Sequence, residues 1–192
     1  MSSFYKDLFD RGGTVLTREL QEPKAYYGIK KEVDSGNVLR IKNGVYMLPE
    51  ELANSMIDVE RIIPGGVVCM YSAWTYYGLT TQIPNGYYVA IEKHRKVVAP
   101  EICNIVLCYW EQKYCSIGVE DAVISNHKVK IFCREKSVCD AVKFRNKIGT
   151  DVAIEILKNY LKSKERNVAR LMEFAKQMRI LSVMYHYLEM GL

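Results

Sequence analysis

The segment Val38–Leu48 (VLRIKNGVYML) constrains the fold of this 192-residue chain more than any other stretch. Two short runs rich in β-branched residues flank Asn43-Gly44, a dipeptide typical of two-residue hairpin turns in which both positions need a positive φ. The sequence therefore predicts a β-hairpin with a polar, basic tip that carries Arg40, Lys42 and Asn43.

A helix is expected directly before this hairpin. In Lys24–Ser35 the apolar residues Ala25, Ile29 and Val33 recur every fourth position, which indicates a helix with one buried face. Gly36 follows as a natural left-handed stop. The opposite side of this helix carries Tyr27, Lys30, Lys31 and Asp34.

Two more helical elements are expected upstream, a first helix over Ser3–Arg11 and a short one capped by Thr17. A helix, a turn, a second helix and a basic hairpin follow one another in a winged helix-turn-helix. In that fold the second helix enters the DNA major groove, and the hairpin can contact the flanking backbone. The same order also suits an ordinary helix–hairpin unit with a solvated, charged tip.

The net charge of +5 is unevenly distributed along the chain. Residues 24–44 contain five Lys and Arg against two Asp and Glu, and residues 128–192 contain fourteen against seven. Residues 51–127 contain five against eight, so two basic regions flank a slightly acidic middle. This distribution favours a polyanionic partner, although basic surfaces also occur in proteins that never touch nucleic acid.

The remainder of the chain predicts a mixture of helices and strands. Helices are expected over Glu50–Ile63 and Val67–Tyr77, strands over Tyr87–Ile91, Ile105–Trp110, Ser116–Val119 and Lys128–Phe132, and helices again from Glu135 to Met190. We therefore expect an α+β, mostly helical protein. A winged helix-turn-helix domain would span residues 1–49, and an α+β domain with a small sheet and terminal helices would span residues 50–192.

The composition also bears on location. No apolar run is long enough to cross a membrane, and the N-terminus has no signal-peptide pattern. We therefore expect a cytoplasmic protein with no membrane partner.

The sequence offers no clear metal or catalytic site. Cys103, Cys108 and Cys115 match no structural zinc spacing with either His94 or His127, so neither a metal nor a cofactor is expected. Three scattered acids are similar to those of metal-dependent nucleases, but such residues are common on solvated strands. These acids are Glu92, Glu101 and Asp121. No catalytic residue is therefore assigned, and we expect a protein that is not an enzyme.

Two further patterns have competing interpretations. The aromatic run Trp74, Tyr76 and Tyr77 could stack on bases. On a helix, however, one face is shared by Met70, Ala73, Trp74 and Tyr77, which favours core packing. A second basic surface that faces phosphates, or simply a solvated face, is expected from the C-terminal helices. Its residues are Lys143, Arg145, Lys147, Lys158 and Lys162.

Three longer segments together resemble one protein family. They are VDSGNVLRIKNGVY (Val33–Tyr46), YSAWTYYGLTTQIP (Tyr71–Pro84) and REKSVCDAVKFRNKIG (Arg134–Gly149). In this order and with this spacing they are similar to the antitoxins of type IV abortive-infection (AbiE) toxin–antitoxin loci, and the resemblance covers nearly the whole chain. The first segment is shared by many winged helices, whereas the second and third are more distinctive.

This resemblance implies a DNA-binding transcriptional autorepressor and antitoxin that takes part in phage defence. The N-terminal domain would bind inverted repeats in the double-stranded operator DNA of its own promoter. The C-terminal domain would oppose a nucleotidyltransferase-like toxin without forming a stable complex with it.

The helix–hairpin pattern and the resemblance together point to one set of DNA-contacting residues. They are Thr17, Arg18, Lys24, Tyr26, Tyr27, Lys30, Lys31, Arg40, Lys42 and Asn43. Lys30 and Lys31 stand where related recognition helices often carry arginine, and lysine binds phosphate well but reads guanine less specifically. Two alternatives stay open: a module that neutralises a protein toxin without binding DNA, and an enzyme that reverses toxin damage.

Overall fold

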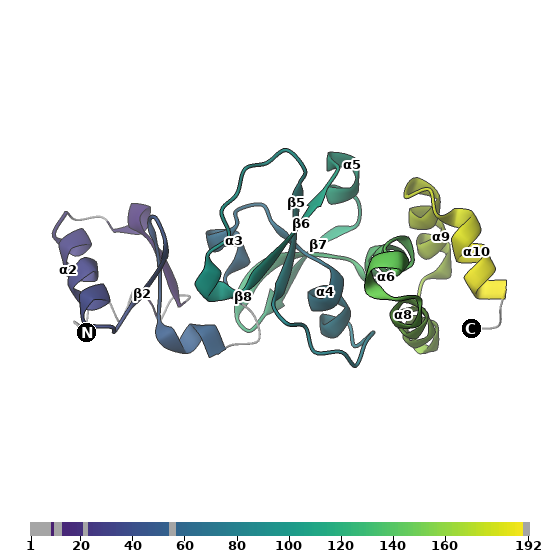
Figure 1. Ribbon diagram of the computed structural model, residues 1–192, viewed down its shortest axis with the longest axis horizontal. Helices are drawn as coiled ribbons and strands as arrows, with labels where there is room; N and C mark the ends of the chain where they lie inside the picture. Colours follow the sequence, from purple (N-terminus) through teal and green to yellow (C-terminus); the bar gives the residue numbers. More distant parts are fainter. Residues whose placement is uncertain (1–8, 10–12, 21–22, 54–56, 190–192) are drawn as a thin grey trace.

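The computed structural model describes residue 9 and residues 13–20, 23–53 and 57–189. These residues form three parts that follow one another along the long axis of the molecule: a small sheet with one helix, a central sheet, and a group of C-terminal helices (Figure 1). The predicted α+β class is confirmed. The helix expected over Ser3–Arg11 lies outside the described residues apart from Phe9, which is buried.

The N-terminal part contains a three-stranded antiparallel sheet and one α-helix. Its elements are β1 (Thr14–Leu16), the 3-10 helix η1 (Thr17–Glu19), α2 (Pro23–Asp34), β2 (Leu39–Lys42) and β3 (Val45–Met47). The strand order is β1-β3-β2, so β3 lies in the middle. The predicted helix before the hairpin is confirmed: Ala25 and Ile29 are buried, and Gly36 follows its last turn with a φ of +76°.

Both faces of this small sheet are covered, because successive side chains of a strand point to opposite sides. Tyr46 of β3 packs in one buried cluster with Ile29 of α2. Its neighbours Val45 and Met47 join a different cluster that includes Ile62 of the central part. One face of the N-terminal sheet therefore depends on the central part for its burial. The predicted boundary between two domains stays a prediction.

The hairpin turn differs from the expected one. Of the two turn residues only Gly44 has a positive φ, which is +74°. The strand register shifts between Arg40, which pairs with Tyr46, and Lys42, which pairs with Val45. The expectation that both turn residues have a positive φ was wrong, because a β-bulge closes the hairpin and only the glycine takes the left-handed conformation.

The central part is built around a five-stranded mixed sheet in the order β6-β5-β4-β8-β7. Its strands are β4 (Val67–Val68), β5 (Tyr87–Glu92), β6 (Ile105–Trp110), β7 (Val119–Ile124) and β8 (His127–Phe132). Short helical segments accompany them: η2 (Pro49–Ala53), α3 (Val59–Ile62), α4 (Met70–Tyr76), η3 (Glu101–Cys103) and α5 (Gln112–Cys115). β5 and β6 are parallel, so both strands end at the same edge of the sheet.

Three sequence-based boundaries in the central part were wrong. The strand β4 occupies the start of an expected helix, because its two residues find hydrogen-bonding partners in β5 and β8 that a local pattern does not reveal. The strand expected over Ser116–Val119 begins only at Val119, as β7. Gly118 directly before it adopts the left-handed conformation, with a φ of +66°. The helix expected over Glu50–Ile63 is not continuous, since its described residues form the separate segments η2 and α3.

The C-terminal part consists of helices that pack beside the central sheet (Figure 1). They are α6 (Arg134–Lys143), α7 (Arg145–Ile148), α8 (Thr150–Lys162), α9 (Val168–Gln177) and α10 (Leu181–Glu189). Trp74 of α4 is fully buried against them, and its indole N–H donates a hydrogen bond of 2.8 Å to the Ser137 carbonyl. The core role predicted for Met70, Ala73 and Trp74 is confirmed, and Tyr77 of the same face is half-buried, with its hydroxyl donating to the Phe132 carbonyl. Within the described part of the chain, no helix has the length and apolar character that crossing a bilayer requires.

Candidate nucleic-acid interface

The outer face of α2 carries three lysines that the sequence assigned to DNA contact. Lys24, Lys30 and Lys31 are exposed, and none of them forms an ion pair within the described residues. The opposite face of the helix is fixed on the N-terminal sheet through Ile29, which is fully buried. The three ammonium groups therefore point into solvent from a helix whose orientation is set by its core.

Two tyrosines lie beside these lysines. The rings of Tyr26 and Tyr27 meet edge to face, with centroids 6.0 Å apart and ring planes at 76°. Tyr26 is 44% exposed and Tyr27 is 73% exposed. Their hydroxyl groups can donate hydrogen bonds to phosphate oxygens, and their rings offer apolar surface to a thymine methyl group.

Arg40 extends this surface from the helix to the hairpin. Directly paired residues of neighbouring strands place their side chains on the same face of a sheet. Arg40 pairs with Tyr46, whose side chain packs on the α2 side, so Arg40 also lies on the α2 side. Its side chain is exposed, and its guanidinium donates a hydrogen bond to the side-chain oxygen of Asn43, which is exposed at the turn. The arrangement keeps the Arg40 charge at the hairpin edge next to α2.

Lys42 does not belong to this surface, contrary to the sequence-based expectation. The β-bulge pairs Lys42 with Val45, whose side chain faces the central part. The Lys42 ammonium donates a hydrogen bond to the carbonyl oxygen of Ile62, and burial followed by the positive charge of Arg95 lowers its pKa. The one-residue register shift turns the Lys42 side chain away from α2. Lys42 therefore links the hairpin to the central part.

The short helix before α2 is a single 3-10 turn. Thr17 is half-buried next to the hairpin, and its backbone N–H donates a 2.8 Å hydrogen bond to the Gly44 carbonyl. Arg18 is exposed. Glu19 forms an ion pair of 3.0 Å with Arg61, which also donates to the carbonyl oxygen of Thr14. Arg61 was not singled out from the sequence, yet it fixes the N-terminal part on the central part.

The C-terminal basic residues are only partly available. The Lys143 ammonium lies 3.5 Å from the centre of the Tyr114 ring and 3.4 Å from the Met178 carbonyl oxygen, and Arg145 donates to the Val142 carbonyl at 3.0 Å. The exposed members of this group are Lys147, Lys158 and Lys162. α8 and α2 lie at opposite ends of the molecule (Figure 1), so the two basic regions form separate surfaces.

The acids considered for nuclease chemistry are not brought together. Glu92 is the last residue of β5, whereas Asp121 lies on β7. In the sheet β7 is the third strand from β5, so the two strands are about 14 Å apart. Glu101 belongs to η3 and is exposed. Among the residues that the structure describes, no three His, Cys, Asp or Glu side chains are grouped as metal ligands would be.

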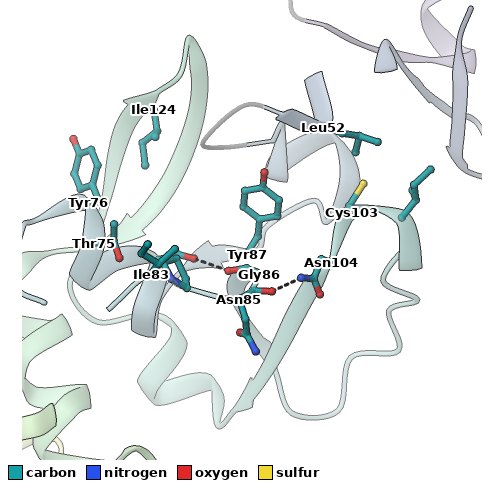
Figure 2. Close-up of a pocket in the computed structure, with 13 residues that line it drawn as sticks. Leu52, Thr75, Tyr76, Ile83, Asn85, Gly86, Tyr87, Cys103, Asn104 and Ile124 are labelled. Atoms are coloured by element: carbon teal, nitrogen blue, oxygen red, sulfur yellow. Dashed lines mark hydrogen bonds between the residues drawn. The ribbon is translucent and has the colours of Figure 1, made fainter. Parts of the chain in front are cut away.

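A cavity of about 690 Å³ lies beside β5 and α4, and its labelled residues come from η2, α4, β5, η3, the end of β7 and the adjoining loops (Figure 2). Its lining is largely apolar, and none of the described residues that form it is charged. Burial raises the pKa of the Cys103 thiol at its wall to about 11, so this cysteine is not a ready nucleophile.

Comparison of the chain with protein-family models and with curated proteins finds no match.

Proposed function

We propose that this protein binds double-stranded DNA through the outer face of α2 and the adjacent edge of β2, and that it represses transcription of its own operon. One observation carries the proposal: Lys30, Lys31 and Arg40 are exposed on the same side of the N-terminal part, without a carboxylate partner within the described residues. Phosphate contacts of such cations supply a large share of protein–DNA affinity.

The element order supports a winged helix-turn-helix interpretation. η1 and α2 correspond to the helix pair, and β2 and β3 correspond to the wing. In such domains the second helix lies in the major groove, which admits an α-helix, and the wing touches neighbouring phosphates. α2 exposes a polar face along its 12 residues while Ile29 anchors the other side, as this docking mode requires.

The antitoxin role rests on the resemblance of the three segments. The second and third segments, which are the distinctive ones, are in contact in the structure: Trp74 donates to the carbonyl of Ser137. They therefore contribute to a common core beside the central sheet. We propose that the N-terminal part reads the operator, while the C-terminal part opposes a nucleotidyltransferase-like toxin.

The test is a titration of the full-length protein into labelled duplex DNA from the region upstream of its gene, followed by fluorescence anisotropy. The variant Lys30→Ala with Lys31→Ala should bind at least tenfold more weakly, with a salt slope reduced by about two. A matched control is Lys158→Ala with Lys162→Ala, which removes two exposed lysines from α8. Equal affinity of the α2 variant and the wild type would remove α2 from the interface.

A further inference from the structure

A run of basic residues, Lys93–Lys96 (KHRK), directly follows β5. It belongs to residues 51–127, which are slightly acidic on average, and it holds three of the five Lys and Arg residues there. The other two, Arg61 and Lys113, each form an ion pair with an acid. The three Lys and Arg of the run form no ion pair within the described residues. The cations of this stretch that lack an acidic partner are therefore all in one loop.

This β5–β6 loop returns the chain from the end of β5 to the start of β6. Because the two strands are parallel, the loop has to run back along the sheet. Val97 of the loop packs against the buried cluster that contains Val45 and Met47 of β3 and Ile62 of α3. The loop therefore lies on the side of the central part that faces the N-terminal sheet, and Figure 1 shows it leaving β5 in this direction.

Arg95 brings positive charge next to the hairpin. Its Nη1 atom lies 3.5 Å from the position that a Cβ on Gly65 would take, in the turn after α3. The Lys42 ammonium bonds the Ile62 carbonyl of α3, and its pKa is lowered by burial and then by the charge of Arg95. Like charges repel, so an anion that binds at this place relieves an unfavourable interaction. Lys42 is already bonded, whereas Arg95 is half-buried and Lys96 is exposed, both without an acidic partner.

α2, the hairpin and the central part with this loop follow one another along the long axis of the molecule (Figure 1). In a winged helix-turn-helix the second helix lies in the major groove, and the wing touches phosphates beside it. A duplex that continues past the wing in the same direction meets the β5–β6 loop next. The order of the basic elements in the protein therefore matches the order of grooves and phosphates along one duplex.

We propose that Arg95 and Lys96 contact backbone phosphates of the operator duplex beyond the hairpin, so that the DNA interface extends from the N-terminal part onto the central part. This inference rests on the DNA-binding function proposed above. The forked guanidinium of Arg95 can bind two phosphate oxygens at once, and Lys96 supplies a compact charge. Phosphate contacts carry no sequence information, so the loop adds affinity and fixes the orientation of the protein on the duplex.

The first test is an anisotropy titration of the full-length protein into a labelled duplex of about 40 base pairs, roughly four helical turns, from the region upstream of its gene. Arg95→Gln with Lys96→Gln should weaken binding about three- to tenfold and reduce the salt slope by about two. Lys96→Glu alone should weaken binding at least threefold, and a change at this exposed position does not disturb packing. The matched control Lys158→Gln with Lys162→Gln removes the same charge from α8 and should change affinity by no more than about twofold.

Hydroxyl-radical footprinting on the same duplex, at saturating protein, localises the contact. The wild type should protect a continuous stretch, and the Arg95 and Lys96 double variant should lose protection at one end only. Protection that weakens evenly along the stretch would overturn the inference, because long-range attraction instead of a local contact would then explain the loss of affinity.

The α2 variant Lys30→Ala with Lys31→Ala separates this inference from the proposed function. If that variant binds at least tenfold more weakly while both loop variants keep the affinity and footprint of the wild type, the loop contact is overturned and the proposed function stands. If the α2 variant binds as tightly as the wild type, the proposed docking of α2 is wrong and the loop contact built on it is overturned as well.

Discussion

The two basic regions of this protein carry similar kinds of charge but use them differently. The lysines of α2 are exposed and have no acidic partner within the described residues. Many cations of the C-terminal part instead contact the protein itself: Lys136 pairs with Asp140, Arg134 with Glu165, and Arg170 with Glu120. Net charge along a sequence is therefore a weak guide to where a polyanion binds, because the partners of each cation decide whether its charge is available.

The largest effect that this comparison predicts concerns Lys136. The change Lys136→Met leaves Asp140 as a buried carboxylate without its counter-charge and should lower the free energy of unfolding by about 3–5 kcal/mol at pH 7. Urea denaturation followed by circular dichroism measures this loss. The control Lys158→Met removes an exposed lysine and should cost less than about 0.5 kcal/mol. Losses of similar size in the two variants would contradict the distinction between engaged and free lysines.

The next effect is a pH dependence centred on Asp140. Burial raises the pKa of this carboxyl from 3.8 to about 6, although the charge of Lys136 opposes that rise. As pH rises from about 4 to about 6, the unfolded chain loses the Asp140 proton before the folded protein does. The contribution of Asp140 to the free energy of unfolding therefore falls over this range and stays constant at higher pH.

The size of that fall is on the order of 3 kcal/mol. It should appear as the difference in unfolding free energy between the wild type and Asp140→Asn, measured by urea denaturation from pH 4 to pH 7, because other titrating groups cancel in the difference. A difference that stays constant, or that increases with pH, would show that the Asp140 pKa is not raised.

A smaller effect separates two neighbouring cations of the hairpin. Arg40→Gln should weaken DNA binding by about three- to tenfold with little change in stability, since it removes one exposed phosphate contact. Lys42→Gln should lower the free energy of unfolding by about 1 kcal/mol and leave DNA affinity unchanged, since its ammonium bonds the Ile62 carbonyl. Anisotropy titrations and urea denaturation of both variants measure the contrast. Equal losses of DNA affinity would contradict the orientation that the β-bulge gives to Lys42.

The smallest expected effect belongs to the exposed lysines of α8. Lys158→Gln with Lys162→Gln should change DNA affinity by no more than about twofold at physiological salt, because this surface lies far from α2 and contributes only weak, screened attraction (Figure 1). A loss of about tenfold in the same anisotropy titration would instead place the C-terminal helices on DNA.

The comparison also shows what the sequence could predict. The helix before Gly36 and the hairpin after it follow from local periodicity and turn chemistry, and both are present. The orientation of Lys42 could not be predicted, because a single-residue register shift reverses the face of a strand without any change in composition. The burial of Lys136 was hidden as well, since a lysine four residues before an aspartate on a helix usually indicates a solvated pair.

A second cavity, of about 400 Å³, lies where the central sheet meets the C-terminal helices and illustrates a further limit. Its lining includes residues at the ends of β5 and β6 and residues of α5, α6 and α7, which only the folded chain brings together. The sequence did contain one signal, since Glu111 directly follows the strand expected over Ile105–Trp110 and Lys93 lies two residues after the strand expected over Tyr87–Ile91. The sequence alone does not show that β5 and β6 are parallel neighbours, so it could not predict that these two residues lie at the same edge of the sheet.

The central claim, that the outer face of α2 is the DNA-binding surface, is tested most directly by nuclear magnetic resonance. Isotope-labelled full-length protein would be titrated with duplex DNA from the region upstream of its gene, and shifts of the backbone amide signals would be mapped. We predict that the largest shifts fall on Tyr27, Lys30, Lys31 and Arg40, while α8 is unaffected. Shifts confined to the C-terminal helices, or unchanged α2 signals at saturating DNA, would contradict the account.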